Sequence, residues 1–250
     1  MSIHVHKTGL NKTLGQQSDT IVATSNLIGN WDPSAGIQTE YWENQVSGGN
    51  HLRRFNSITH NNSAPHNFQF DGTDDYLGVA STNYGGSAFN VNAANAFTLA
   101  QWVKYNAANH QAFILSNDSD EMTTLDLNAN TSNKAYLTVV STTTSVSDGL
   151  TFDFTFSDDT WYYIALTHDG SGNYVFYVNG SFIGISGMGK SAFNGALRIG
   201  RNDSNYTAAG TKVGHVHIYD VALTNSQIRQ NFLASHKINS DRIYGATYTA

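Results

Sequence analysis

Residues 161–185 read WYYIALTHDGSGNYVFYVNGSFIGI, and this stretch decides the fold class. Two runs within it, residues 161–167 and 174–178, are rich in the aromatic and β-branched side chains that favour strands. The Asp-Gly and Asn-Gly pairs that follow these runs tolerate the positive φ that tight hairpins demand. The stretch therefore predicts a meander of three antiparallel strands, of which the third covers residues 182–185.

Similar short runs occur on both sides of the meander, separated by turn-forming Asn, Asp, Ser and Gly. They cover residues 27–32, 97–103, 111–115, 123–127, 135–140, 150–156, 197–199 and 213–219. In the run at 97–103, Phe97, Leu99, Gln101 and Val103 lie on one face of the strand, and Trp102 lies on the other. Both faces of this strand therefore require apolar cover. The spacing of about a dozen residues predicts a sandwich of two sheets, with this strand at the centre of one.

A single helix is predicted near the carboxyl end. Thr224 is its N-cap, and Gln227 completes a capping box three residues later. Ile228, Phe232 and Leu233 then form an apolar stripe. We also expect Trp31, Trp42, Trp102 and Trp161 to belong to the core rather than to a ligand platform.

The pattern divides the chain into three parts. Residues 1–25 are polar and lack both strand and helix periodicity, which predicts an amino-terminal arm with a role in attachment. Residues 26–235 form the main domain, since all-β sandwiches of this length are routinely single domains. Residues 236–250 are expected to be a carboxyl-terminal tail.

Composition narrows the class of partner. Charged residues make up only 13% of the 250 residues, against about 25% in average globular proteins, and the formal net charge is −6. No basic run occurs, which argues against nucleic acid as a partner. No stretch approaches the roughly 18 apolar residues of a membrane span, and the amino terminus has no apolar core of signal-peptide length. Cysteine is absent, so the fold needs no disulfide.

Several segments, taken in order, carry a family resemblance. They are FDGTDDYL at residues 70–77, FTLAQWV at 97–103, WYYIALT at 161–167, NYVFYVNG at 173–180 and VHIYDVALT at 216–224, with weaker matches at 27–32 and 42–51. Together they resemble the laminin G-like, or concanavalin A-like, jelly-roll family over residues 27 to 235. The resemblance implies an all-β, two-sheet jelly-roll sandwich with one short C-terminal helix. It implies much less about function, because this architecture hosts lectins, glycosidases, adhesion modules and viral surface proteins.

The chain departs from the family at one functional position. In the family that this chain resembles, an acidic pair usually precedes the last strand, and acidic residues there often serve calcium binding. This chain has Gly214-His215 at that position and His217 in place of the following Arg. We therefore predict no metal ion and no other cofactor.

Catalysis is not expected. Glycosidases of this fold resemble one another in having two glutamates on one strand, as nucleophile and acid. The three glutamates here, Glu40, Glu43 and Glu121, do not form such a pair. No G-x-S-x-G nucleophile elbow surrounds any serine. The sequence predicts a protein that is not an enzyme.

Two His-x-His pairs admit two interpretations each. His215 and His217 lie on one face of a predicted strand, about 7 Å apart, and are either metal ligands or polar side chains on a solvated face. His4 and His6 either meet around a metal ion in a three-fold assembly or belong to a plain flexible arm. In both cases we favour the second interpretation.

Polar loops supply the candidate site. Residues 201–206 form a long connection on which a sugar could stack against Tyr206 while Asn202, Asp203 and Asn205 bind its hydroxyl groups. The turn that begins with Asn117 and Asp118 has the oxygen-rich character of a calcium loop or of an ordinary turn. We select all six residues as a candidate glycan-binding site.

The leading functional hypothesis is a virion structural protein of a bacteriophage, because a cysteine-free, leaderless, Asn/Ser/Thr-rich jelly roll with a polar arm resembles domains of phage surface proteins. Such a protein decorates a capsid or forms part of a tail or fibre after assembly in the host cytoplasm. Its partners are other virion proteins, copies of itself and host glycans. The alternatives are a free, extracellular carbohydrate-binding module or lectin and, less favoured, a polysaccharide-cleaving enzyme.

Overall fold

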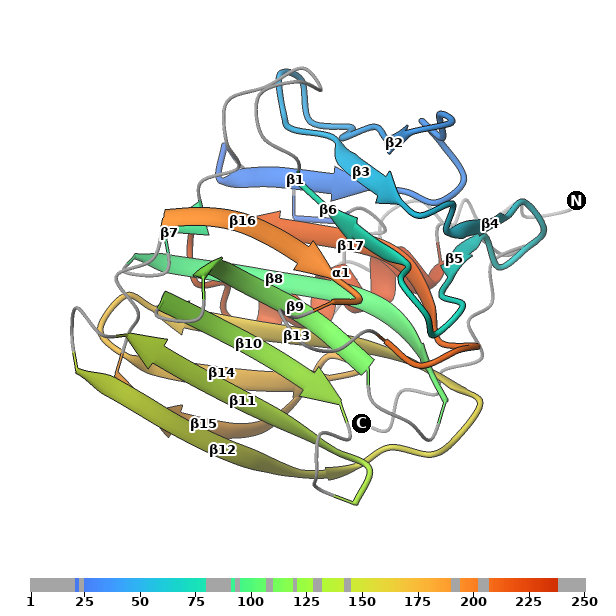
Figure 1. Ribbon diagram of the computed structural model, residues 1–250. Coiled ribbons are helices and arrows are strands. Elements are labelled where there is room, and N and C mark those ends of the chain that lie inside the picture. The colour runs from blue at the N-terminus through green and yellow to red at the C-terminus, as the bar shows by residue number, and fades with distance from the viewer. Residues whose placement is uncertain are drawn as a thin grey trace, which may run out of the picture.

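A computed structural model describes most of the chain. The described residues are 21–22, 25–79, 91–92, 95–106, 110–118, 121–127, 132–141, 145–189, 194–201 and 207–237. They form two antiparallel β-sheets packed face to face, with one helix on the outer side of one sheet (Figure 1). The predicted all-β sandwich with one C-terminal helix is confirmed.

Sheet A contains the meander and the central strand. Its order is β15 (Ser181–Gly187), β14 (Asn173–Val178), β13 (Thr160–Asp169), β8 (Ala96–Tyr105), β17 (Lys212–Tyr219), β5 (Asn67–Gln69) and β4 (Thr59–Asn61), and β1 (Leu27–Trp31) also pairs with β17. As predicted, the strand that carries Trp102 lies in the middle, between β13 and β17.

Sheet B lies in front of sheet A in Figure 1. Its order is β12 (Val146–Thr155), β11 (Lys134–Ser141), β10 (Glu121–Leu127), β9 (His110–Asp118), β16 (Asn194–Ile199), β6 (Tyr76–Gly78), β3 (Leu52–Phe55) and β2 (Tyr41–Trp42), and β7 (Val91–Asn92) pairs with β16. Each strand expected from the sequence in this sheet is present, and most extend further than the pattern indicated. The largest extension is that of β12, which starts at Val146 rather than at residue 150 because Gly149 continues the ladder instead of ending it.

The main core fills the space between the sheets. Inward side chains of both sheets supply it, among them Phe97, Leu99, Leu137, Leu166 and Phe176, all essentially inaccessible to solvent. The four tryptophans are buried as predicted, with at most 7% of their surface exposed.

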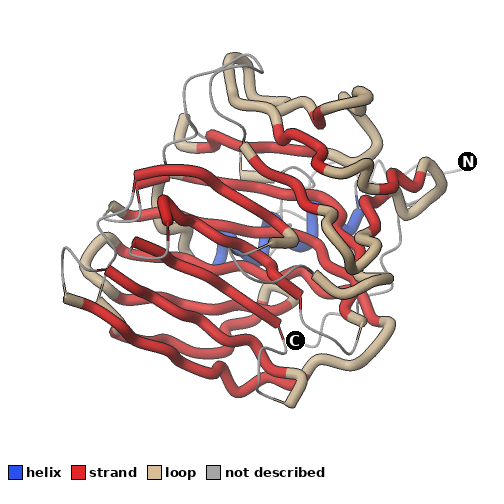
Figure 2. Tube along the Cα trace, viewed as in Figure 1, coloured by secondary structure: helices blue, strands red, loops and turns tan. Residues whose placement is uncertain are grey.

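A second apolar cluster covers the outer side of sheet A. Trp102 and Tyr163 of the sheet pack there against Phe232 of α1 (Asn225–Lys237), and the Trp102 indole donates a 2.8 Å hydrogen bond to Ser235 Oγ. Figure 2 shows the helix behind the strands. Its predicted capping box is present, because the backbone N–H of Thr224 donates to Gln227 Oε1 at 2.9 Å. No helix in the described part of the chain is long and apolar enough to cross a membrane.

Part of the predicted arm contacts this cluster. Val22 is buried, its N–H donates to Asn231 Oδ1 at 2.7 Å, and its carbonyl accepts a 3.0 Å hydrogen bond from the Tyr219 hydroxyl. The chain at residues 21–22 is therefore tied to both α1 and β17. Residues 1–20 and 238–250, which hold the rest of the predicted arm and nearly all of the predicted tail, lie outside the described residues.

Candidate functional site on the outer face of sheet B

The outer face of sheet B becomes polar across β10 and β11. Along β11, buried and half-buried residues alternate without interruption. Leu137 and Val139 point into the core, so Tyr136 and Thr138 point outward. The face is directed toward the viewer in Figure 1.

Tyr136 lies along the sheet instead of standing away from it. A Cβ atom placed on Gly149 of the neighbouring strand would lie only 1.9 Å from the Tyr136 hydroxyl oxygen and 2.6 Å from the ring carbon that carries it. The missing side chain at position 149 therefore makes room for the phenol ring over β12. A half-buried aromatic ring on an exposed strand presents a flat apolar surface beside polar neighbours.

Asp126 stands directly opposite Tyr136 in the ladder between β10 and β11. Its side chain is only 7% exposed, and Oδ1 has no hydrogen-bond partner. Burial raises the pKa of this carboxyl group to about 7, so both protonation states are populated near neutral pH. A buried carboxyl group with an unused acceptor is the kind of group that marks functional sites.

Hydroxyl groups surround this pair. Thr124 lies opposite Thr138, and Thr151 lies opposite Tyr136 on the other side. The Lys134–Asp153 ion pair, at 2.6 Å, lies next to them, and because Asp153 is almost fully exposed it adds little stability. A half-buried aromatic ring beside threonine hydroxyls and a carboxyl group suits a polar ligand with one apolar face, such as a sugar.

Glycoside hydrolysis places a defined demand on the carboxyl groups of a site. A retaining enzyme requires two carboxyl groups about 5 Å apart, and an inverting one requires them about 6.5–9.5 Å apart, flanking the bond to be cleaved. Near Tyr136, the described side chains supply two carboxyl groups, the buried one of Asp126 and the exposed one of Asp153, which is paired with Lys134. Glu40 and Glu43 flank β2 at the other edge of sheet B.

The six residues predicted from the sequence lie mostly outside what the structure describes. Asn117 and Asp118 belong to the end of β9, where Asp118 pairs with Glu121 across the hairpin to β10. Their side chains, and the whole of residues 202–206 with Asn202, Asp203, Asn205 and Tyr206, lie outside what the structure describes. The pairing of β16 with β9 shows that the chain reaches residue 201 beside the start of β9, about 25 Å along the strand from Asp118. The two groups of predicted residues are thus attached to opposite ends of the strand.

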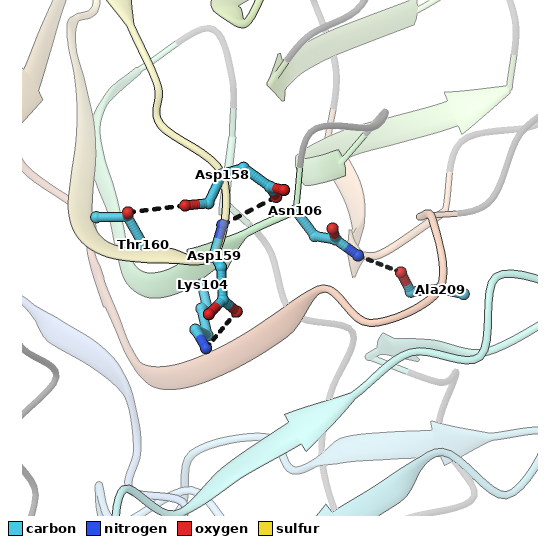
Figure 3. Close-up of polar contacts among 6 residues, drawn as sticks. All are labelled: Lys104, Asn106, Asp158, Asp159, Thr160 and Ala209. Carbon is cyan, nitrogen blue, oxygen red and sulfur yellow. Dashed lines mark hydrogen bonds and ion pairs between the residues drawn. The ribbon is translucent and has the colours of Figure 1, made fainter.

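Hydrogen bonds hold the residues that directly follow the predicted sugar loop, from residue 207 onward. Thr207 Oγ1 lies 3.3 Å from Nδ1 of the buried His110, whose pKa burial lowers to about 3, so that its ring is neutral. Asn106 donates to the Ala209 carbonyl at 2.6 Å (Figure 3). At the same end of the sandwich, Lys104 pairs with Asp159 (Figure 3). These contacts fix the point at which the loop returns to the domain.

The interpretation of His215 and His217 as polar groups on a solvated face is wrong. The structure buries both, because β1 pairs with β17 and the cluster under α1 covers this side of the sheet. A bulge between Val213 and Val216 brings the imidazole centres to 4.2 Å. His215 Nε2 lies 2.7 Å from Asn30 Oδ1. Within the described ranges no third His, Cys, Asp or Glu joins them at metal-binding spacing.

One group of carboxylates does have such a spacing. Asp71, Asp74 and Asp75 each place an oxygen within 4.8 Å of the others. Asp71 Oδ1 already accepts the backbone N–H of Thr73, and Asp75 Oδ2 accepts that of Asp71, as in an ordinary turn. That the chain holds no metal ion stays a prediction, and the other candidate ligands, His4 and His6, lie outside the described residues.

Asp126, Tyr136 and Gly149 were not singled out by sequence reasoning. An outward Asp between two leucines is the ordinary pattern of a half-solvated strand, and Gly149 has the signature of a turn. The one usable signal was a glycine that interrupts an otherwise regular strand, since such a glycine can mark close approach of another group.

The fold is a concanavalin A-like jelly roll, and comparison with known proteins agrees. The laminin G model described as the concanavalin A-like lectin/glucanases superfamily matches residues 71–229, which is more than half of the chain. The chain therefore belongs to this superfamily. No curated protein matches it in sequence.

Solved structures with the same fold come from toxins and from a sialidase. The binding domain of botulinum neurotoxin serotype G has a TM-score of 0.65 at 13% identity over 86% of this chain and 52% of that one. Trypanosoma rangeli sialidase has a TM-score of 0.62 at 18% identity, over 88% of this chain and 34% of that one. The binding domain of Paraclostridial Mosquitocidal Protein 1 has a TM-score of 0.62 at 13% identity, over 85% of this chain and 53% of that one. The chain thus spans about half of each toxin domain and a third of the sialidase. At these identities the likeness establishes the fold alone.

Proposed function

We propose that the chain is a non-catalytic glycan-binding module that is carried on the surface of a bacteriophage virion. The observation that carries the glycan-binding part is the Tyr136 ring lying over Gly149, opposite the buried carboxyl group of Asp126. The ring supplies the apolar face on which a sugar stacks, and Thr138 and Thr151 supply hydrogen-bonding groups at its edges. Toxin binding domains with the same fold, one of them in complex with rat synaptotagmin II, make a binding role a natural use of this architecture.

Binding of the full-length chain to a glycan array tests this part, followed by titration of the best ligand. We expect Tyr136→Ala to weaken binding about tenfold, since losing one aromatic contact costs about 1.4 kcal/mol. Gly149→Ala should weaken it similarly without removing any group, because the new methyl displaces the phenol ring from its place on the sheet.

Tyr41→Ala is the matched control, since Tyr41 is a half-buried tyrosine on the far edge strand β2 of the same sheet. Equal affinity of the wild type, Tyr136→Ala and Gly149→Ala would contradict the placement of the site. Loss of binding on Tyr206→Ala or Asn202→Ala alone would move the site to residues 202–206.

The virion part rests on the cysteine-free composition with few charged residues and on the polar amino-terminal segment. Its test is mass spectrometry of purified particles, with protection of residues 1–20 from protease in the particle but not in the free chain. A free lectin is the second candidate, and it predicts glycan binding without any association with particles. Polysaccharide hydrolysis that Glu121→Gln abolishes would overturn the non-catalytic assignment.

A further inference from the structure

Exposed apolar surface is concentrated on one strand. Of the residues that the structure describes, two large hydrophobic side chains are exposed, Phe182 at 52% and Ile185 at 61%. Both belong to β15, the last strand of sheet A, which lies at the lower edge of the sandwich in Figure 1. Clustered apolar exposure of this kind marks an interaction surface more often than scattered exposure does.

A bulge places the two side chains on the same face. Phe182 lies opposite Tyr177 and Ile185 lies opposite Val175, whereas Ile183 is the extra residue between them. Tyr177 and Val175 belong to the cluster on the outer side of sheet A. Without the bulge, side chains three positions apart would point to opposite faces.

The edge formed by β15 also lacks the features that keep other edges from pairing. Its sequence, SFIGISG, contains no charge and no proline over seven residues. The neighbouring edge strand β12 carries exposed Asp148 and Asp153, and the edge strands β4 and β2 have only three and two residues. Charge and shortness protect these other edges, and β15 has neither; its bulge is the one protecting feature that it carries.

The strand is complementary to itself. In an antiparallel pair of two β15 strands related by a two-fold axis between Ile183 and Gly184, Phe182 of each copy lies opposite Ile185 of the other. Ser181 then lies opposite Ser186. The faces agree as well, since Phe182 and Ile185 are both outward, while Ser181 and Ser186 lie opposite the core residues Val178 and Tyr174. Aromatic side chains facing β-branched ones are favourable cross-strand pairs.

We propose that β15 is a self-association edge through which a second copy of this chain joins sheet A antiparallel, with Phe182 opposite Ile185 on each side of the two-fold axis. The occupant is a copy of the chain because β15, paired with itself in this register, matches both its apolar pair and its serine pair. The proposal goes beyond the proposed function, because the edge lies on sheet A and the glycan site on sheet B.

Sedimentation velocity of the full chain over a concentration series tests the proposal. The wild type is expected to form a dimer, and Phe182→Lys should weaken dimerisation about 100-fold, because two like charges then face apolar groups across the axis. Ile185→Lys should act in the same way. Ser147→Lys, on the exposed edge strand β12, should leave the dimer unchanged.

A thiol cross-link tests the register, and the absence of native cysteine makes its result unambiguous. Opposite residues of antiparallel strands have Cα atoms about 4.5–5.5 Å apart, which suits a disulfide. The double variant Ser181→Cys, Ser186→Cys should therefore give a covalent dimer on mild oxidation. Ser181→Cys alone should not, because its two copies lie about 16 Å apart in this register.

Two results overturn the proposal. One is a wild-type chain that remains monomeric up to about 1 mM. The other is a dimer that survives both lysine substitutions. Tyr136→Ala is expected to leave the dimer intact, so failure of the glycan site and failure of this edge are distinguishable.

Discussion

Replacement of Asp126 by Asn should change the pH dependence of stability in a defined direction. Burial raises the pKa of the folded-state carboxyl group from 3.8 to about 7. Between these values the folded chain holds a proton that the unfolded chain has released. The stability contributed by the protonated group is therefore fully present below about pH 4 and is lost as the pH rises through about 7. An amide has no such proton to lose, so the variant escapes this loss.

The size of the effect follows from the shift. A difference of about 3 pKa units, at about 1.4 kcal/mol per unit, corresponds to about 4 kcal/mol. Asp126→Asn should thus unfold with nearly the wild-type free energy at pH 4 and be up to about 4 kcal/mol more stable than the wild type at pH 8. The gain should grow by about 1.4 kcal/mol per pH unit between about pH 4 and pH 7 and level off above pH 7.

Urea denaturation of both proteins at unit steps from pH 4 to pH 8 measures this difference. Other groups with shifted pKa values, such as Asp75, titrate in both proteins and cancel. Asp148→Asn is the control, because its exposed side chain changes its surroundings little on unfolding. A stability difference for Asp126→Asn that does not vary with pH would refute the idea that this carboxyl group is buried without a partner.

Two further changes probe the framework that supports the site. Thr224→Ala should lower the free energy of unfolding by about 1 kcal/mol, measured by urea denaturation, because the Thr224 hydroxyl that accepts the Gln227 backbone N–H at the start of α1 is lost. Gly200→Ala should lower the free energy of unfolding by about 3 kcal/mol, since position 200 has φ +95° and the new methyl would lie 2.2 Å from the buried ring of Phe70. Gly48→Ala is the control, because position 48 has φ +73° but open space around it, and it should lower the free energy of unfolding by about 1 kcal/mol. Equal costs at the two glycines would show that the clash with Phe70 is relieved elsewhere.

Local patterns predicted the elements well. The predicted meander appears as β13, β14 and β15, with positive φ at Gly170, Asn179 and Gly180 in its turns. The central position of the strand with Trp102 followed from apolar residues on both of its faces. These features depend on residues a few positions apart, which the sequence displays directly.

Local patterns failed where burial depends on distant segments. His215 and His217 alternate like residues of a solvated strand, but β1, about 190 residues earlier in the chain, and the helix that follows β17 cover them. Likewise, nothing near Asp126 in the sequence shows that its carboxyl group is enclosed.

The sequence by itself determined the strands of five or more residues, the turns of the meander, the capped helix and the family, because strand alternation, glycine turns and caps act over a few residues. The tertiary structure decided which strands are neighbours, and with them the site. Asp126, Tyr136 and Gly149 meet because β10, β11 and β12 pair in one register, and a shift of one residue would turn Tyr136 into the core. The exposed edge of β15 is equally a tertiary result, since the order of the described strands leaves β15 with a neighbour on one side only.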